Sequence, residues 1–130
     1  MRRVLGEAHP ETLTSMSNLA LTYIGQRKYA QAEDLLRETL RTFERTAPDS
    51  WRRYNSQSLL GASVAGQEKY AEAEPLLVSG YEGLVQRQAT IPVESRSALK
   101  EAGQRIVQLY QSWGKADKVA EWTQKLRSRL

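Results

Sequence analysis

The 130-residue chain contains no cysteine, one histidine and one phenylalanine. Without cysteine it has no disulfide framework and no thiolate metal site. A single imidazole without clustered acids assembles neither a catalytic triad nor a metal centre, so we expect His9 to make a local turn contact. The lack of cysteine also favours a reducing compartment. We therefore expect a cytoplasmic protein that is not an enzyme and needs no metal or cofactor.

Long apolar runs are also missing. The N-terminal stretch MRRVLGEAHPE lacks the apolar core of a signal peptide, and no run approaches the roughly 20 residues of a membrane-spanning helix. The 19 basic and 15 acidic residues, with a net charge of +4, are scattered along the chain. Scattered charge disfavours nucleic-acid and membrane partners. The length and the 40% hydrophobic content fit one domain with a packed core.

Hydrophobic residues recur with the period of an α-helix along nearly the whole chain. One such stripe contains Leu13, Met16, Leu19, Ala20 and Tyr23. With the turn residues between stripes, the pattern predicts helices over about residues 10–25, 29–45, 50–66 and 70–87, one ending near 113 and one beginning at 116. No segment alternates with the period of a strand. The fold class is therefore all-α, with six main helices.

Two segments of the sequence are near twins. GQRKYAQAEDLL (Gly25 to Leu36) and GQEKYAEAEPLL (Gly66 to Leu77) are identical at nine of twelve positions. Each spans the turn of a helical hairpin, so the six helices form three hairpins in a repeat array and not one closed bundle. We expect Tyr29 and Tyr70 to wedge between neighbouring hairpins, and four small residues to allow helices to approach closely. Those small residues are Ala20, Ala32, Gly61 and Ala73. The twins are therefore structural joints and not two copies of a binding site.

These hairpins resemble tetratricopeptide repeats. The first matches the family's leucine, small and aromatic positions at Leu19, Ala20, Tyr23, Tyr29, Ala32 and Leu36. The second matches them at Leu60, Gly61, Tyr70, Ala73 and Leu77. The resemblance implies a right-handed superhelical solenoid. It assigns residues 1–8 to the tail of a preceding helix, 9–47 and 48–89 to two repeats, and 90–130 to a degenerate third repeat with a C-terminal cap. Residues 1–8 then make the chain a fragment of a longer array.

Two finer resemblances concern the parent protein. The offset of the twins exceeds the family's usual period of about 34 residues. This longer unit and the segment HPETLTSMSNLA are similar to the kinesin-light-chain-like subclass. The C-terminal half resembles the repeats appended to bacterial serine/threonine kinases, although the chain carries no kinase motif. The second resemblance implies a bacterial source and a kinase-linked parent.

Members of the family bind partner proteins or peptides in a concave groove lined by the first helix of each hairpin. Transferring the groove positions gives Thr14, Ser17, Asn18, Leu21, Asn55, Ser58, Ala62, Glu101, Arg105 and Gln108. Asn18 stands where the family uses an asparagine amide to hold the backbone of an extended peptide. The alternative is an amide that is hydrogen-bonded to a neighbouring helix. The resemblance thus implies a scaffold for protein–protein interaction.

Arg52 and Arg53 open the third helix, where the positive end of the helix dipole disfavours them. An anion contact, for example with an acidic peptide, would compensate. We favour the alternative, in which Asp49, the expected N-cap of this helix, and Glu44 neutralise the two arginines.

A second functional class is a structural element of a larger, kinase-linked signalling protein with no peptide ligand of its own. Terminal repeats of a solenoid expose apolar faces unless they are capped. Exposed terminal faces would then pair copies into a homo-oligomer.

Overall fold

The computed structural model describes residues 9–129, and the expected tail of a preceding helix at residues 1–8 lies outside them. Within the described part, six α-helices and two short 3-10 helices follow one another without a strand. In chain order they are α2 (Pro10–Gly25), α3 (Tyr29–Thr46), α4 (Trp51–Gly66), α5 (Tyr70–Gln86), η1 (Gln88–Thr90), η2 (Val93–Ser95), α6 (Ser97–Trp113) and α7 (Ala116–Ser128).

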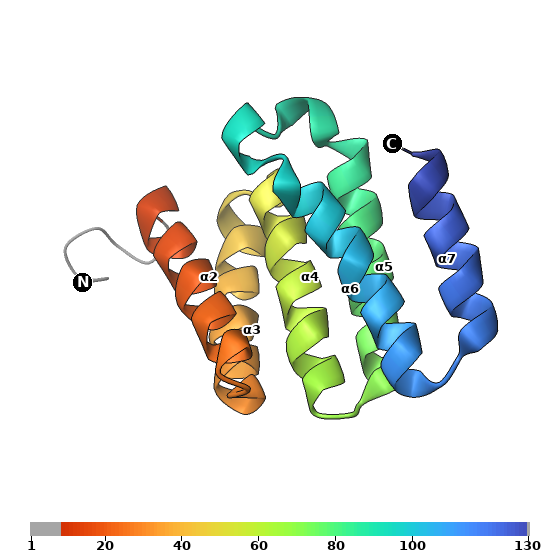
Figure 1. Cartoon of the computed structure of the whole chain (residues 1–130). Helices are drawn as coiled ribbons and strands as arrows, with labels where there is room; N and C mark the ends of the chain where they lie inside the picture. Colours follow the sequence, from red (N-terminus) through yellow and green to blue (C-terminus); the bar gives the residue numbers. More distant parts are fainter. Residues whose placement is uncertain (1–8, 130) are drawn as a thin grey trace.

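The helices form three hairpins that stack one after another (Figure 1). They are α2–α3, α4–α5 and α6–α7. The first helix of each later hairpin packs on the one before it, because α4 contacts α2 and α3, and α6 contacts α4 and α5. This arrangement confirms the all-α array of hairpins predicted from the sequence.

The small residues of the two twin segments and their partners lie at the closest contacts. Ala20, Ala32 and Ala73 have no exposed surface. A Cβ placed on Gly61 would lie 2.6 Å from Cγ of Leu77, across the α4–α5 hairpin. The expectation that small residues allow close approach is therefore confirmed.

The two tyrosines of the twin segments join successive hairpins. The ring of Tyr29 covers Gly66 at the end of α4 so closely that a Cβ there would overlap it. The ring of Tyr70 stacks on that of Trp113, with their centroids 6.0 Å apart. Tyr29 and Tyr70 therefore act as joints, as the sequence predicted.

Two local expectations are wrong. The N-cap of α4 is Ser50 and not Asp49, because Oγ of Ser50 accepts the backbone N–H of Arg52 at 3.2 Å. The Asp49 carboxylate instead accepts a hydrogen bond from the Arg87 guanidinium at 3.2 Å. Leu19 lies outside the buried stripe of α2 and is 44% exposed. At about 100° per residue, Ala20 lies about 20° around the helix from the buried Leu13, whereas Leu19 lies about 120° away from it.

Candidate functional site

A shallow pocket of about 260 Å³ crosses the first helices of all three hairpins. We call it the first-helix pocket. It is lined by Thr14, Ser17, Asn18, Trp51, Arg52, Asn55, Glu94, Ser95, Ser97, Ala98 and Glu101. Stacking of the hairpins therefore brings together polar residues that are far apart in the sequence.

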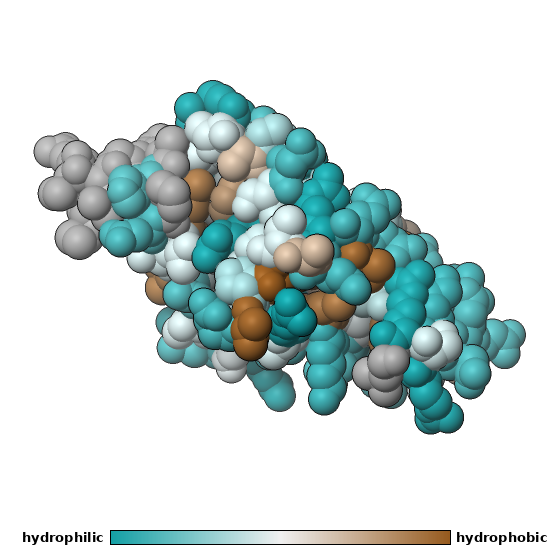
Figure 2. All heavy atoms as spheres, turned by 90° about the horizontal axis from the view of Figure 1, so that it is seen from above, coloured by the Kyte–Doolittle hydropathy of each residue, from teal (hydrophilic) through white to brown (hydrophobic). Residues whose placement is uncertain are grey.

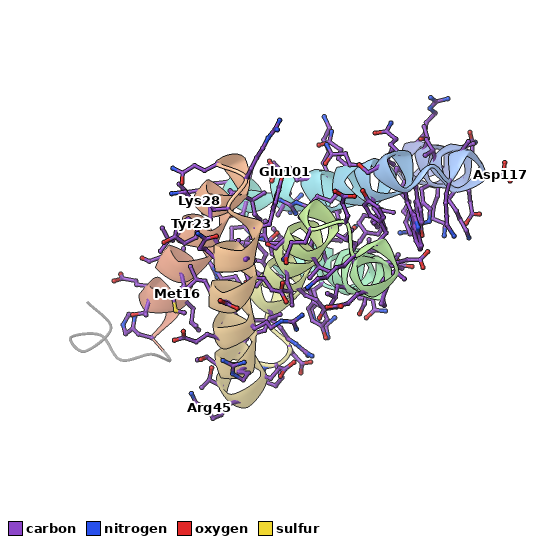
Figure 3. The ribbon with its side chains drawn as sticks, turned by 90° about the horizontal axis from the view of Figure 1, so that it is seen from below. Met16, Tyr23, Lys28, Arg45, Glu101 and Asp117 are labelled. Carbon is purple, nitrogen blue, oxygen red and sulfur yellow. The ribbon has the colours of Figure 1, made fainter. Side chains whose placement is uncertain are left out.

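Helical spacing turns these side chains to a common side. Thr14 and Asn18 are separated by four residues on α2, on the face opposite the buried Leu13. Ser97 and Glu101 have the same spacing on α6. Figure 3, seen from below, labels Met16 and Tyr23 on α2 and Glu101 on α6. Each first helix thus gives a short polar stripe to the pocket.

Two side-chain hydrogen bonds link the first helices of the three hairpins. The Oγ atoms of Ser17 on α2 and Ser56 on α4 lie 3.0 Å apart. Between α4 and α6, Nη1 of Arg105 donates to Oγ of Ser58 at 3.1 Å. Burial lowers the pKa of the Arg105 guanidinium from its ordinary value, and the charge of Glu101 acts in the opposite direction. These bonds set the positions of the three helices relative to one another.

Ser58 was predicted from the sequence to line the groove, but its position in the structure differs. It has no exposed surface, so its side chain does not line a groove. Arg105 is partly buried and points its guanidinium at Ser58 and not into the pocket. Both residues were expected to face a partner, but they tie α4 to α6. The physical reason is the close packing of α6 on α4, which encloses the side chains between them.

The side-chain amides of Asn18 and Asn55 are open, which means here that they make no hydrogen bond within residues 9–129 and line the pocket. Within residues 9–129, neither side chain has a hydrogen-bond partner; Asn18 only accepts, through its backbone carbonyl, a bond from Thr22. The alternative that the Asn18 amide is bonded to a neighbouring helix is therefore not seen. Each amide offers both a donor and an acceptor. Together they provide two open amides in one pocket.

The two arginines at the start of α4 have different surroundings. Arg53 donates to the Pro48 carbonyl at 2.8 Å and lies 3.7 Å from the Glu44 carboxylate, outside the pocket. The guanidinium of Arg52 lies 4.8 Å from the centre of the Trp51 ring and lines the pocket. The backbone N–H of Arg52 is taken by the Ser50 cap. Pairing with Glu44 thus agrees with the favoured expectation, whereas Asp49 pairs with Arg87 instead.

Three other predicted groove residues lie away from the first-helix pocket. Leu21 is 48% exposed on α2, and Ala62 is partly buried on α4. Gln108 lines a separate hollow between α5, α6 and α7. Conversely, sequence reasoning missed pocket residues on η2 and at the start of α6, such as Glu94 and Ser97. The break near residues 90–92 gave no signal of where the following segment folds.

His9, the histidine of the chain, lies at the start of α2. Nδ1 of His9 accepts the N–H of Glu11 at 3.1 Å, which is a helix cap and the expected turn bond. Across residues 9–129, histidines and acids nowhere form a group of three or more that could hold a metal ion. Every helix described is too short or too polar to cross a membrane.

Comparison with known proteins identifies the repeat type of the first hairpin. Residues 12–50, which cover most of α2, all of α3 and the turn before α4, match the family model of the tetratricopeptide repeat. A search of curated proteins finds no match. Tetratricopeptide repeats generally mediate protein–protein interaction. Together with the stacked hairpins, the matched segment supports a tetratricopeptide-type repeat protein.

Proposed function

We propose that the chain is a scaffold for protein–protein interaction that binds an extended segment of a partner protein in the first-helix pocket. The observation that carries this proposal is the pair of open amides, Asn18 and Asn55, on neighbouring first helices. An extended peptide exposes backbone N–H and C=O groups that amides can bind in both directions. Thr14 adds a hydroxyl to the same lining.

The charged residues of the first-helix pocket restrict the charge of the peptide that it can bind. Arg52 is the basic residue of the lining, and Glu94 and Glu101 are its acids. Two carboxylates against one guanidinium disfavour a purely acidic peptide. We propose a neutral segment, or one with a basic side chain that reaches Glu94 and Glu101.

We also propose the finer family placement. Repeats over residues 9–47, 48–89 and 90–130 each hold one hairpin. The long α3, with 18 residues, supports a kinesin-light-chain-like unit. The resemblance of the C-terminal half supports a cytoplasmic, kinase-linked bacterial parent. Sequencing the flanks of the gene tests this placement, and a parent without a kinase domain would contradict the kinase link.

The peptide-binding proposal is tested by selecting ligands from a displayed library of random linear peptides and measuring Kd by calorimetry. We expect Asn18→Ala with Asn55→Ala to weaken binding about tenfold, since each amide loses hydrogen bonds worth about 0.5–1.5 kcal/mol. Neither amide is bonded within residues 9–129, so the variant should stay folded. A Ser17→Arg change would be a less specific test of the pocket, because it would also disturb the hydrogen bond between Ser17 and Ser56.

The matched control removes two exposed amides elsewhere, with Gln31→Ala on α3 and Gln124→Ala on α7. It should bind the selected peptides like the wild type. Equal weakening by both pairs of changes, or selection of no peptide at all, would rule out the first-helix pocket as the binding site.

The alternative is a self-assembly element, and one observation favours it. Leu19 and Leu21 are 44% and 48% exposed on α2, the first described helix of the array. If these leucines pair copies, light scattering should give a mass above that of the monomer, and Leu19→Gln with Leu21→Gln should restore the monomer. A strict monomer at high concentration would remove this alternative.

A further inference from the structure

A second hollow, of about 970 Å³, lies between α5, α6 and α7. In the view of Figure 1, α6 and α7 meet at their shared turn and lie farther apart towards the end of α7. We call this hollow the α6–α7 trough. Its apolar lining includes Val85 on α5, Leu99 and Val107 on α6, and Leu126 on α7. Figure 2, seen from above, shows hydrophobic atoms among hydrophilic ones in the middle of the molecule's surface.

The charged residues of the trough all have one sign. Arg96, Lys100, Arg127 and Arg129 line it, and its described lining contains no aspartate or glutamate. Arg129 donates to the Glu82 carboxylate at 3.0 Å and is thereby partly neutralised. The other three have no ion-pair partner within residues 9–129. An apolar surface with unpaired positive charge is unusual in a chain whose charges are otherwise mixed, and it fits a ligand that is both apolar and acidic.

The shape of the trough suits a helix. Its lining follows α6 from Leu99 to Gln111, which is about 18 Å at about 1.5 Å per residue. The chain itself contains a precedent, because α6 lies on the preceding hairpin, α4–α5, and buries Ala102 and Ile106 there. The α6–α7 hairpin is the next of the same kind. A helix laid along it would cover its apolar lining in a similar way.

We propose that the α6–α7 trough binds an acidic amphipathic helix of a partner protein. The apolar face of that helix contacts Leu99 and Val107, and its carboxylates reach Lys100 and Arg127. This surface is separate from the first-helix pocket and goes beyond the function proposed above. A second copy of the chain is a poorer fit: α2, the helix with exposed leucines, carries Glu11 as its only acid.

The probe is a synthetic, fluorescein-labelled peptide of leucine, alanine and glutamate, with leucines at the spacing of one helix face. Two control peptides have the same composition in scrambled order, or lysine in place of glutamate. We expect the acidic amphipathic peptide to bind in fluorescence anisotropy and to gain helical circular dichroism on binding, because short helices are marginal alone. The controls should bind at least about tenfold more weakly.

Charge reversal locates the site. Lys100→Glu with Arg127→Glu should weaken binding of the acidic peptide about tenfold and allow the lysine peptide to bind, since attraction becomes repulsion. Both side chains are exposed, so the fold should be kept, which circular dichroism checks. The matched control, Lys28→Glu with Arg41→Glu, makes the same change in net charge on exposed residues elsewhere. It should bind the acidic peptide like the wild type.

Several results would overturn the proposal. Equal binding of the scrambled peptide, or equal weakening by the Lys28 and Arg41 changes, would indicate non-specific attraction. Binding of dodecanoate but not of the peptide would indicate a small amphipathic anion. Self-association that the Lys100 and Arg127 changes abolish would make a second copy the occupant. The asparagine variant of the first-helix pocket should leave peptide binding at the trough unchanged, so the two proposals can fail separately.

Discussion

At the scale of single residues, the glycines of α5 are explained by the helix that packs against them. A Cβ on Gly80 would lie 2.9 Å from the backbone nitrogen of Ser58 and 3.0 Å from the carbonyl oxygen of Tyr54. Backbone atoms cannot rotate away as a side chain can. Glycine inside a helix costs about 1 kcal/mol relative to alanine, and here the close approach of α4 and α5 outweighs that cost.

We therefore expect Gly80→Ala to destabilise the protein by about 1–3 kcal/mol through overpacking. Gly25, at the end of α2, is the matched control because no atom would lie within 4 Å of an added Cβ. Gly25→Ala should be neutral or stabilising by up to about 1 kcal/mol. Urea unfolding measures both, and similar effects at the two positions would contradict the packing described here.

A second residue-scale prediction concerns Tyr110, whose buried hydroxyl donates to Oε2 of Glu74 at 2.7 Å. Burial, and then the hydrogen bond and charge of Glu74, raise the pKa of the Tyr110 hydroxyl well above its ordinary value. The unfolded chain then releases this proton at a lower pH than the folded chain. Stability from Tyr110 is thus fully present below about pH 10 and is lost as pH rises further.

Tyr110→Phe should cost about 1 kcal/mol at neutral pH, where the hydrogen bond is lost. The variant should also lose stability less steeply than the wild type above about pH 10. Unfolding free energies measured at neutral pH and above pH 10 check both effects. Parallel losses in the two proteins at high pH would show that Tyr110 does not titrate as described.

At the scale of elements, the three hairpin turns share one backbone feature. The residue before the first lysine of each turn is left-handed: Arg27 has φ 62°, Glu68 φ 65° and Gly114 φ 76°. Residues with a Cβ adopt this backbone conformation at an energetic cost, whereas glycine adopts it without that cost. Only the third turn uses the residue that the backbone favours.

We expect Glu68→Gly to stabilise the protein by about 0.5–1 kcal/mol, because relief of the left-handed strain exceeds the entropy lost by glycine. The reciprocal change, Gly114→Glu, should destabilise by about 1–2 kcal/mol. Thermal unfolding measures both. Loss of stability with Glu68→Gly would mean that the contribution of the Glu68 side chain to stability exceeds the strain of its left-handed backbone.

The attachment of α7 depends on one large side chain. Trp122 is 4% exposed, and its ring meets that of Tyr81 on α5 edge to face, with centroids 5.9 Å apart. Trp122→Ala should cost about 3–5 kcal/mol and release α7 to limited proteolysis. Glu121→Ala, one residue away and exposed, should change stability by less than about 0.5 kcal/mol. An uncleaved α7 in the tryptophan variant would refute this role.

At the scale of the whole molecule, each hairpin depends on its neighbours. Figure 3 shows the two ends far apart, with Met16 near one and Asp117 near the other. Between consecutive hairpins, Glu33 on α3 accepts a bond from Gln67 at 2.7 Å. This bond, and to a lesser extent Arg37, lowers the pKa of the Glu33 carboxyl despite the opposing effect of burial. The α4–α5 hairpin is packed on both sides and the outer hairpins on one.

Hydrogen exchange should therefore be slowest in α4 and α5 and faster in α2 and α7, because elements with fewer neighbours open at lower free energy. Native-state exchange followed by mass spectrometry measures this order. Equal protection of α7 and α4 would instead indicate that the array opens as a single unit.

The helices, their hairpin pairing and the joints between hairpins followed from the sequence alone. Their signals are local: the helical period, the turn residues and the small and aromatic positions of the twin segments act over a few residues. Asn18 and Asn55 could be chosen as candidate pocket residues because the resemblance to tetratricopeptide repeats places them at groove positions of the first helices.

Only the tertiary structure decided which candidates stay open. Ser58 is enclosed and bonded to Arg105, whereas Asn55, three residues earlier, lines the first-helix pocket. Likewise, the divergence of α6 from α7 created a trough that no pattern in the sequence predicted. The physical reason is that exposure depends on how each helix is rotated and tilted against helices far away in the chain, and local periodicity contains no information on those angles.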